Sequence, residues 1–191
     1  MGRWEPDSRG RLQEAALILF AERGFDQTTT AEIAARAGVT ERTFFRHFAD
    51  KREVLFGGHE ELRRRIVAAV VAAPAESGPL EAVTEGLEAA AGLLGAFRRD
   101  LSRRRQSVIA ANPELREREL AKLADYAAAV AAALRERGVG ELGAALAAES
   151  GMTVLRVALQ RWASGTDDRS LVEVVHSLIG ELREVTAAAE R

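Results

Sequence analysis

The sequence predicts an all-α protein, both from its composition and from the spacing of its apolar residues. Alanine, leucine, arginine and glutamate, all strong helix formers, recur throughout the 191 residues, whereas prolines number only four. Apolar residues recur three and four positions apart, which is the period of an amphipathic helix, and runs of β-branched residues are short. Because 47% of the residues are hydrophobic, we expect a folded core rather than a disordered chain.

The first predicted helix covers residues 8–23. Its apolar residues fall on one helical face, namely Leu12, Ala15, Ala16, Leu19 and Phe20. Gly24 supplies the left-handed residue that commonly ends a helix, and Phe25 can fold back onto the last turn.

The next segment, TTTAEIAARAGVTERTFFRHF at residues 28–48, is predicted to form two short helices joined by a tight turn. Thr29 and Glu32 have the spacing of a capping box, so one helix should start near Thr30. Gly38 ends this helix, and Thr40 is a suitable N-cap for a second helix from residue 41 to about residue 48. Two short helices joined in this way are typical of a helix-turn-helix.

A longer helix is predicted from residue 51 to about residue 73, because Asp50 and Glu53 form another capping-box pair. Gly57 and Gly58 lie inside it, and we interpret them as a flexible point, the alternative being that small residues allow close packing there. Further helices are expected at residues 79–97, 100–110, 113–137, 141–163 and 168–188, separated by glycine- and proline-containing breaks.

Charge and residue content exclude several function classes. The net charge is −2, and residues 1–52 hold nine basic against eight acidic residues, so any DNA contact must come from a local basic face. The chain has no cysteine, and its three histidines are far apart in sequence. We therefore expect no cofactor, no metal and no enzyme activity. No signal peptide and no long uninterrupted apolar run is visible, so a cytoplasmic protein without a membrane segment is expected.

The second short helix offers the side chains that could read DNA. Arg42, near its start, suits a guanine edge, and Phe45 would be exposed because Phe44 and Phe48 occupy the buried face. The candidate phosphate contacts are Thr30, Thr43, Arg46, His47 and Lys51. The alternatives are that each Arg is an ordinary solvated residue and that His47 has a structural role. A helical interaction module without DNA binding would explain the second half of the chain but not this segment.

Residues 12–55 resemble the N-terminal domain of the TetR family of one-component repressors. The resemblance covers AALILFAERGFDQTTTAEIAARAGVTERTFFRHFADKREVL. It includes the Gly-Phe pair that follows the first helix, the Thr-Thr pair at the start of the second, the Ala-Gly-Val turn and the Phe-rich recognition helix. It implies phosphate contacts at Thr30, Thr43, His47 and Lys51, and base-reading positions at Ala31, Glu41, Arg42 and Arg46. Many members carry a tyrosine where this chain has Phe45, so the hydroxyl bond to the DNA backbone is lost.

The same resemblance implies an all-helical homodimer that binds a near-palindromic, double-stranded operator and is released by a small molecule. Residues 1–52 would be the DNA-binding domain and residues 53–191 the effector-binding and dimerisation domain. The last two predicted helices have broad apolar faces that favour a four-helix dimer interface over an intrachain core. These faces comprise Leu142, Leu146, Met152, Val154, Leu155, Val157 and Ala158, then Leu171, Val172, Val174, Val175, Leu178, Ile179, Leu182 and Val185.

An effector pocket is expected between about residues 62 and 162. Its candidate residues mix apolar bulk with polar tips, the alternative being plain core, and are Phe97, Gln106, Ile109, Tyr126, Met152 and Trp162. Residues 103–138 resemble the C-terminal domain of a TetR subgroup associated with mycofactocin-type regulators and acyl-CoA-like ligands. That resemblance implies a role for Arg103, beside Arg104 and Arg105, in binding ligand phosphates, although a basic cluster is usually a solvated face.

Overall fold

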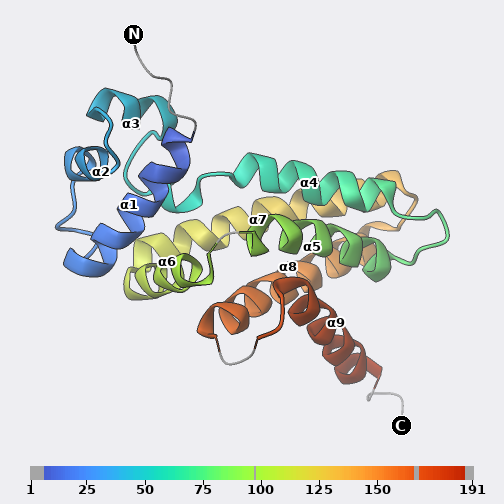
Figure 1. Ribbon diagram of the computed structural model, residues 1–191. Coiled ribbons are helices and arrows are strands. Elements are labelled where there is room, and N and C mark those ends of the chain that lie inside the picture. The colour runs from blue at the N-terminus through green and yellow to red at the C-terminus, as the bar shows by residue number, and fades with distance from the viewer. Residues whose placement is uncertain (1–6, 97, 166–167, 188–191) are drawn as a thin grey trace. The chain divides into compact units, whose positions relative to one another are not determined.

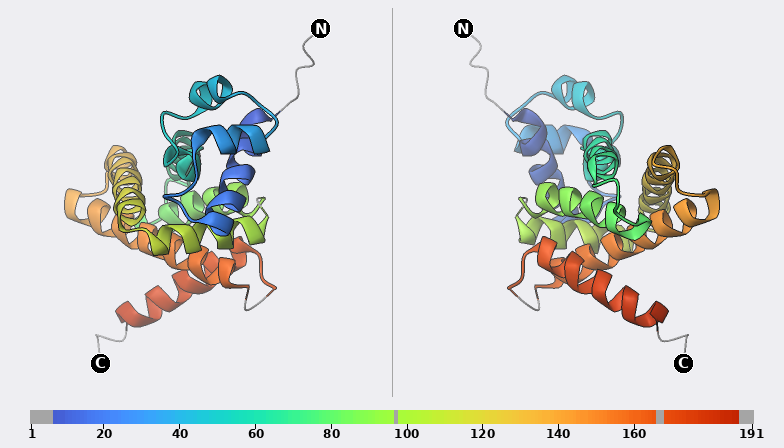
Figure 2. Two further views of the ribbon diagram at one scale, coloured as in Figure 1. Left: turned by 90° about the vertical axis from the view of Figure 1, so that its left-hand side faces the viewer. Right: turned by 90° about the vertical axis from the view of Figure 1, so that its right-hand side faces the viewer.

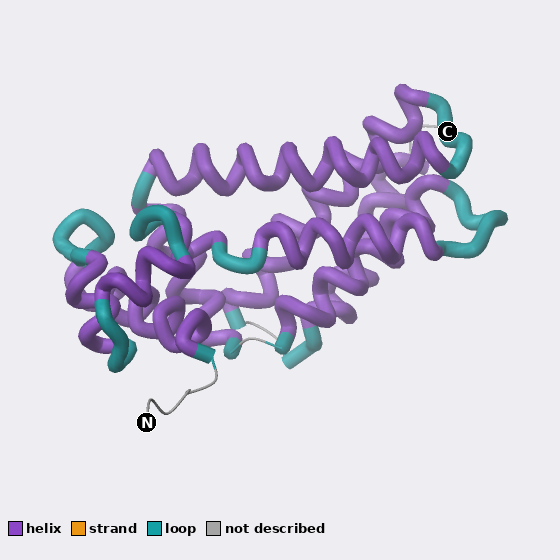
Figure 3. The backbone as a smooth tube through the Cα atoms, turned by 90° about the horizontal axis from the view of Figure 1, so that it is seen from above, coloured by secondary structure: helices purple, strands orange, loops and turns teal. Residues whose placement is uncertain are grey.

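The computed structural model describes residues 7–96, 98–165 and 168–187, and within these ranges it contains helices and no strand (Figures 1 and 3). The predicted all-α fold is confirmed. The helices are α1 Ser8–Arg23, α2 Thr30–Arg36, α3 Glu41–His47, the 3₁₀ helix η1 Glu53–Phe56, α4 His59–Ala72, α5 Pro79–Gly95, α6 Arg99–Ala111, α7 Pro113–Glu136, α8 Glu141–Ser164 and α9 Leu171–Ala187.

The helix-turn-helix forms through the predicted local signals. The Thr29 hydroxyl accepts a hydrogen bond from the Glu32 N–H, and the Glu32 carboxylate accepts one from the Thr29 N–H, which completes a capping box at the start of α2. Gly38 has a φ of 69° in the turn, and the Thr40 hydroxyl accepts from the Thr43 N–H to cap α3. These contacts lie within four residues of one another in sequence, which is why the pattern predicted them.

The predicted single helix from residue 51 to about residue 73 is wrong. Asp50 Oδ1 does accept hydrogen bonds from the N–H groups of Arg52 at 2.7 Å and Glu53 at 3.0 Å, but the N-cap of the next helix is Arg52, and that helix is only the short η1. The chain then breaks at Gly57 and Gly58 before α4 begins. Gly58 has a φ of 100°, which a right-handed helix cannot contain. The glycine pair therefore lies between two helices and not inside one.

The chain divides into two compact units. Unit 1 comprises the chain up to Gly58 together with Asp100–Glu119, and unit 2 comprises His59–Arg99 and the chain from Leu120 onward. Val108, Ile109 and Leu115, from α6 and the start of α7, are buried in the same core as the helix-turn-helix, and this burial places the segment in unit 1. The sequence-based division after residue 52 did not include this second stretch.

Unit 2 is a bundle in which α4, α5, α8 and α9 pack on one another, and its helices can be followed from two sides in Figure 2. Small residues allow the closest approaches. A Cβ added to Gly151 on α8 would lie 2.3 Å from Val83 Cγ1 on α5, and one added to Gly86 would lie 2.9 Å from Val70 Cγ2 on α4. Gly86 and Gly151 thus serve tight helix packing in this bundle.

The apolar faces of α8 and α9 contribute mainly to this intrachain core. The residues buried there include Met152, Val154, Leu155, Ala158, Leu171, Val174, Val175 and Ile179. Leu142 and Leu146 on α8 are instead 81% and 70% exposed, and Val185 on α9 is 73% exposed. The faces predicted for a dimer interface are therefore divided between core and surface.

Among the described residues, α8 is the one helix whose length and composition would allow it to cross a membrane, with a mean hydropathy of 1.3. It packs against α5 and α9 in the core of unit 2.

Candidate nucleic-acid interface

The second helix of the helix-turn-helix, α3, has one buried and one exposed side. Phe44 and Phe48 are buried, with their ring centroids 5.6 Å apart, and they anchor α3 in the core of unit 1. Arg42, Phe45 and Arg46 are exposed, and the Phe45 side chain is 53% exposed, as the sequence predicts. In the part of the chain that the structure describes, neither Arg42 nor Arg46 has a hydrogen-bond or ion-pair partner. The outer side of α3 therefore offers two unpaired guanidinium groups and an aromatic ring to a ligand.

The starts of α2 and α3 are joined by a side-chain hydrogen bond. Thr30 Oγ1 donates to Glu41 Oε1 at 2.5 Å, so a predicted phosphate contact is paired with a predicted base-reading residue. Ala31 is exposed beside them, whereas Thr43 is half-buried and its hydroxyl is 3.0 Å from that of Thr40. Thr30, Ala31, Glu41 and Arg42 are thus grouped at the N-terminal ends of the two helices, where backbone N–H groups favour anions.

His47 is held by the first turn of α1. Its Nε2 lies 2.8 Å from Ser8 Oγ, and the ring is half-buried. Burial lowers the pKa of His47 below its ordinary value, and the positive charges of Arg46 and Arg9 lower it further. The lowered pKa favours the uncharged imidazole, and with it the structural alternative over an ionic phosphate contact. The sequence does not predict that Ser8 and Arg9 lie near His47, because they are about forty positions away from it in the chain.

Lys51 is the predicted site residue whose surroundings differ most from expectation. Its Nζ donates to three backbone carbonyl oxygens in the turn between α1 and α2, those of Phe25 at 2.8 Å, Asp26 at 3.2 Å and Thr28 at 3.2 Å. The ammonium also lies 4.5 Å from the centroid of the Phe25 ring. No local sequence signal indicates these contacts, because Lys51 is 23 to 26 residues away from its partners.

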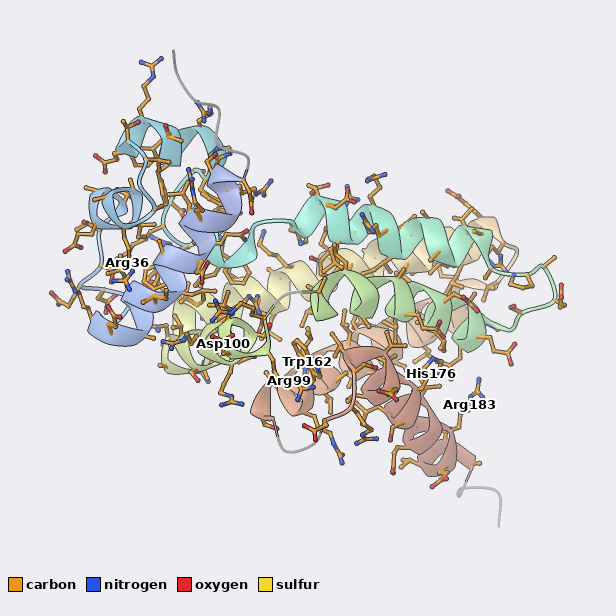
Figure 4. All side chains as sticks on the ribbon, viewed as in Figure 1. Arg36, Arg99, Asp100, Trp162, His176 and Arg183 are labelled. Carbon is orange, nitrogen blue, oxygen red and sulfur yellow. The ribbon has the colours of Figure 1, made fainter. Side chains whose placement is uncertain are left out.

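The predicted effector residues fall into both units. Phe97 lies outside the described residues. Arg103 is exposed, Gln106 is half-buried and Ile109 is buried, and all three belong to unit 1. Tyr126, Met152 and Trp162 are buried in the core of unit 2, where the Arg99 guanidinium lies 5.1 Å from the centroid of the Trp162 ring (Figure 4).

One arginine of the predicted ligand-phosphate cluster is engaged within unit 1. Arg105 Nε donates to the Leu55 carbonyl at 2.8 Å, its Nη1 pairs with Glu119 at 3.0 Å, and its guanidinium lies over the Phe56 ring. These contacts tie α6 to η1. Arg105 therefore supports the core of the helix-turn-helix unit.

A cavity of about 260 Å³ opens between α5 and α9 in unit 2. None of the predicted effector residues lines it; its walls are Glu81, Thr84, Glu85, His176, Ile179, Gly180 and Arg183. His176 and Arg183 project from α9 on this side in Figure 4. No group of three or more His, Asp or Glu side chains that could hold a metal ion occurs among the described residues.

Comparison with known proteins shows what the helix-turn-helix segment is similar to. Residues 12–57 match the family model of the bacterial regulatory proteins of the tetR family. The regulator TcmR of Streptomyces glaucescens, described as an HTH-type transcriptional regulator, is 38% identical over 85 residues, which are 44% of this chain and 38% of TcmR. The aligned segments span 24% to 45% of the lengths of the curated relatives that the chain matches.

Solved structures resemble the whole chain in fold. A transcriptional regulator from Pseudomonas aeruginosa PAO1 has a TM-score of 0.62 and 21% identity, and the match covers 98% of this chain and 94% of that one. The regulator FadR from Bacillus subtilis, in complex with stearoyl-CoA, has a TM-score of 0.58 and 19% identity, covering 90% and 95% of the two chains. At these identities the likeness establishes a shared helical fold.

Proposed function

We propose that this chain, whose residues 12–57 match the family model of the bacterial regulatory proteins of the tetR family, is a cytoplasmic TetR-type transcriptional repressor, and not an enzyme. It would bind double-stranded operator DNA as a homodimer and leave it when a small effector binds. The observation that carries the proposal is the outer side of α3, where Arg42 and Arg46 have no partner among the described residues and Phe45 is exposed. Helix-turn-helix proteins place this side of the second helix in the major groove.

In this proposal different side chains contact the bases, the phosphates and the sugars of the DNA. Arg42, in the first turn of α3, would donate to a guanine edge, and Arg46, one helical turn further on, would contact a base or a phosphate. Thr43 would donate to a phosphate, and Thr30 would do so through its backbone N–H, because its hydroxyl donates to Glu41. Ala31 and Glu41 would face base edges. Phe45 would contact a deoxyribose or a thymine methyl group, since its ring has no hydroxyl with which to bond a phosphate.

Dimerisation through α8 and α9 is supported by the exposed apolar residues that the chain leaves uncovered there. Leu142 and Leu146 are one turn apart on α8, and Val185 lies near the end of α9. Covering such side chains in a second copy would remove apolar area from water. A two-fold axis would place the two α3 helices about 34–36 Å apart, which is one turn of B-DNA.

For the effector we propose an acyl-CoA-like or other hydrophobic molecule. The support is the resemblance of residues 103–138 to a subgroup with such ligands, together with the shared fold of a regulator solved with stearoyl-CoA. Arg103, Gln106, Ile109, Tyr126, Met152 and Trp162 stay candidates. Mass spectrometry of molecules that copurify with the protein, followed by release of bound DNA by the molecule found, tests the ligand class.

Gly57 and Gly58 remain a proposed flexible point for induction, now located between η1 and α4. Replacing both with alanine is a poor test, because a Cβ at Gly57 would lie 2.7 Å from Gln13 Nε2 and Gly58 has a φ of 100°. Gly58→Asn is better, since asparagine tolerates a left-handed backbone. An unchanged effector response in DNA-binding titrations would rule out a requirement for glycine there.

The experiment that tests the main proposal is selection of bound sequences from a random double-stranded DNA library. We expect enrichment of a near-palindromic motif whose half-sites are one helical turn apart. A protein that enriches no sequence, at low salt and after removal of bound small molecules, is not the proposed repressor.

A further inference from the structure

The Lys51 ammonium occupies a site built from backbone oxygens. An ammonium group has three N–H donors, and Lys51 has three carbonyl acceptors, on Phe25, Asp26 and Thr28, at 2.8 to 3.2 Å. The Phe25 ring adds a cation–π contact at 4.5 Å. Every donor of Lys51 is therefore used within unit 1, and none is left for a phosphate.

The turn that supplies these oxygens is itself ordered by buried contacts. The Thr28 side chain, in a residue that is 1% exposed, donates from Oγ1 to the Gly24 carbonyl at 2.8 Å. Phe25 is buried with its ring centroid 5.0 Å from that of Phe20. These contacts bring the carbonyl oxygens of Phe25, Asp26 and Thr28 to one point, where their partial negative charges repel one another unless a cation lies between them.

This turn leads directly into the DNA-facing end of α2. Thr28 is followed by Thr29, which caps α2, and by Thr30, which joins α2 to α3 through Glu41. Lys51 follows the end of α3 by four residues. Its side chain thus fastens the segment after α3 to the turn before α2, on either side of the helix-turn-helix.

We propose that Lys51 is a positioning residue for DNA recognition, which holds the α1–α2 turn and with it the N-terminal end of α2, in place of the phosphate contact expected from the sequence. The inference rests on the proposed DNA binding. A phosphate contact by Lys51 would require the ammonium to leave three hydrogen bonds and the Phe25 ring.

The salt dependence of operator affinity separates the two roles. Each phosphate contact that is lost lowers the slope of log affinity against log salt concentration by about 0.9. Lys51→Met, which keeps the apolar stem, should weaken binding about tenfold or more at every salt concentration, the scale of one lost charge-assisted hydrogen bond, with an unchanged slope. Arg46→Gln is the matched control, because it removes one exposed charge from α3 and should lower the slope.

Lys51→Arg provides a second discriminating variant. A phosphate accepts a guanidinium as readily as an ammonium, so a contact role predicts that Lys51→Arg binds like the wild type. The planar guanidinium cannot direct three N–H groups at three converging carbonyls, so the positioning role predicts weaker binding with the wild-type slope. Wild-type affinity in Lys51→Arg, or a lowered slope in Lys51→Met, would overturn the proposal.

Amide hydrogen exchange in the full-length protein reports on the turn without DNA. Faster exchange at residues 25–32 in Lys51→Met, with α4 and α5 unchanged, is expected if Lys51 fastens the turn, and unchanged exchange at residues 25–32 would overturn the proposal. This measurement also separates the two hypotheses. If the wild type binds no DNA, the proposed function fails, whereas the exchange result still decides whether Lys51 orders the turn.

Discussion

The outer side of α3 and the turn between α1 and α2 make opposite use of their charged groups. Arg42 and Arg46 on α3 have no partner among the described residues, whereas the ammonium of Lys51 has its three donors satisfied by backbone oxygens. The sequence predicts DNA contacts for all three of these side chains. The predicted set therefore contains side chains that are free to meet a ligand, such as Arg42 and Arg46, and a side chain, Lys51, that we propose holds the interface in position.

Substitutions at Phe44 and Phe45 should show the largest contrast between an effect on folding stability and an effect on DNA binding. Phe44→Ala removes a buried ring from the core of unit 1 and should lower the free energy of unfolding by about 3–5 kcal/mol. Phe45→Ala, at the adjacent exposed position, should change it by about 0.5 kcal/mol or less while weakening operator binding. Urea denaturation measures the first effect and DNA titration the second. Equal destabilisation by the two substitutions would contradict the assignment of Phe45 to the contact surface.

Arg42 should carry sequence discrimination. Arg42→Ala is expected to reduce the difference in binding free energy between operator and a single-base variant by about 1–3 kcal/mol, because a guanidinium reads a guanine edge through paired hydrogen bonds. Arg64→Ala is the matched control, since Arg64 is an exposed arginine on α4 that pairs with Glu61. If both variants discriminate as the wild type does, Arg42 does not read a base.

Glu41 is expected to oppose binding at the same surface. Its carboxylate accepts a hydrogen bond from the Thr30 hydroxyl and adds a negative charge to the surface that would face the polyanionic DNA. Glu41→Gln should therefore tighten binding to non-specific DNA by about 0.5–1 kcal/mol, the scale of an exposed charge interaction, and fluorescence anisotropy measures this change. Weaker non-specific binding by Glu41→Gln would show that the carboxylate helps to place Thr30.

The smallest expected effect is a pH dependence of stability at His47. The pKa of His47 lies below 6.5 in the folded protein, because burial and then Arg46 and Arg9 disfavour its charged form. The unfolded chain thus takes up the proton first, and the contribution to stability is complete above about pH 6.5 and falls as the pH drops toward the folded-state pKa.

Urea denaturation of wild type and His47→Gln at about pH 7.5 and pH 5.5 isolates this contribution, because His59 and His176 are common to both proteins. The wild type should lose more stability on acidification than the variant does. The opposite order would mean that the folded protein favours the imidazolium.

Local signals in the sequence were sufficient for most helix boundaries. The contacts that start and end α2 and α3 join residues at most four positions apart, so the local sequence is enough to predict them. They are the capping box of Thr29 and Glu32, the turn at Gly38 and the cap at Thr40. The same kind of signal occurs at Ser170 and Glu173, whose mutual hydrogen bonds start α9 at Leu171, three residues after the predicted start.

What could not be predicted depends on contacts between distant segments. Lys51 meets the turn at residues 25–28, His47 meets Ser8, and Arg105 meets Leu55, over separations of 23 to 50 residues. The break at Gly57 and Gly58 does not follow from the sequence pattern, because the signal at Asp50 and Glu53 is that of a helix start. The sequence indicates these site residues as one group, whereas their proposed division into contact and support follows only from the packed structure.

The most direct test of this division is a titration of the full-length protein with its selected operator, followed by backbone amide NMR shifts. We expect the largest shifts at residues 30–31 and 41–46, with smaller shifts at residues 25–28, since that turn supports the interface without touching DNA. Shifts at residues 25–28 as large as those at residues 41–46 would contradict this division, and unchanged shifts at residues 41–46 would contradict the assignment of α3 as the DNA-reading helix.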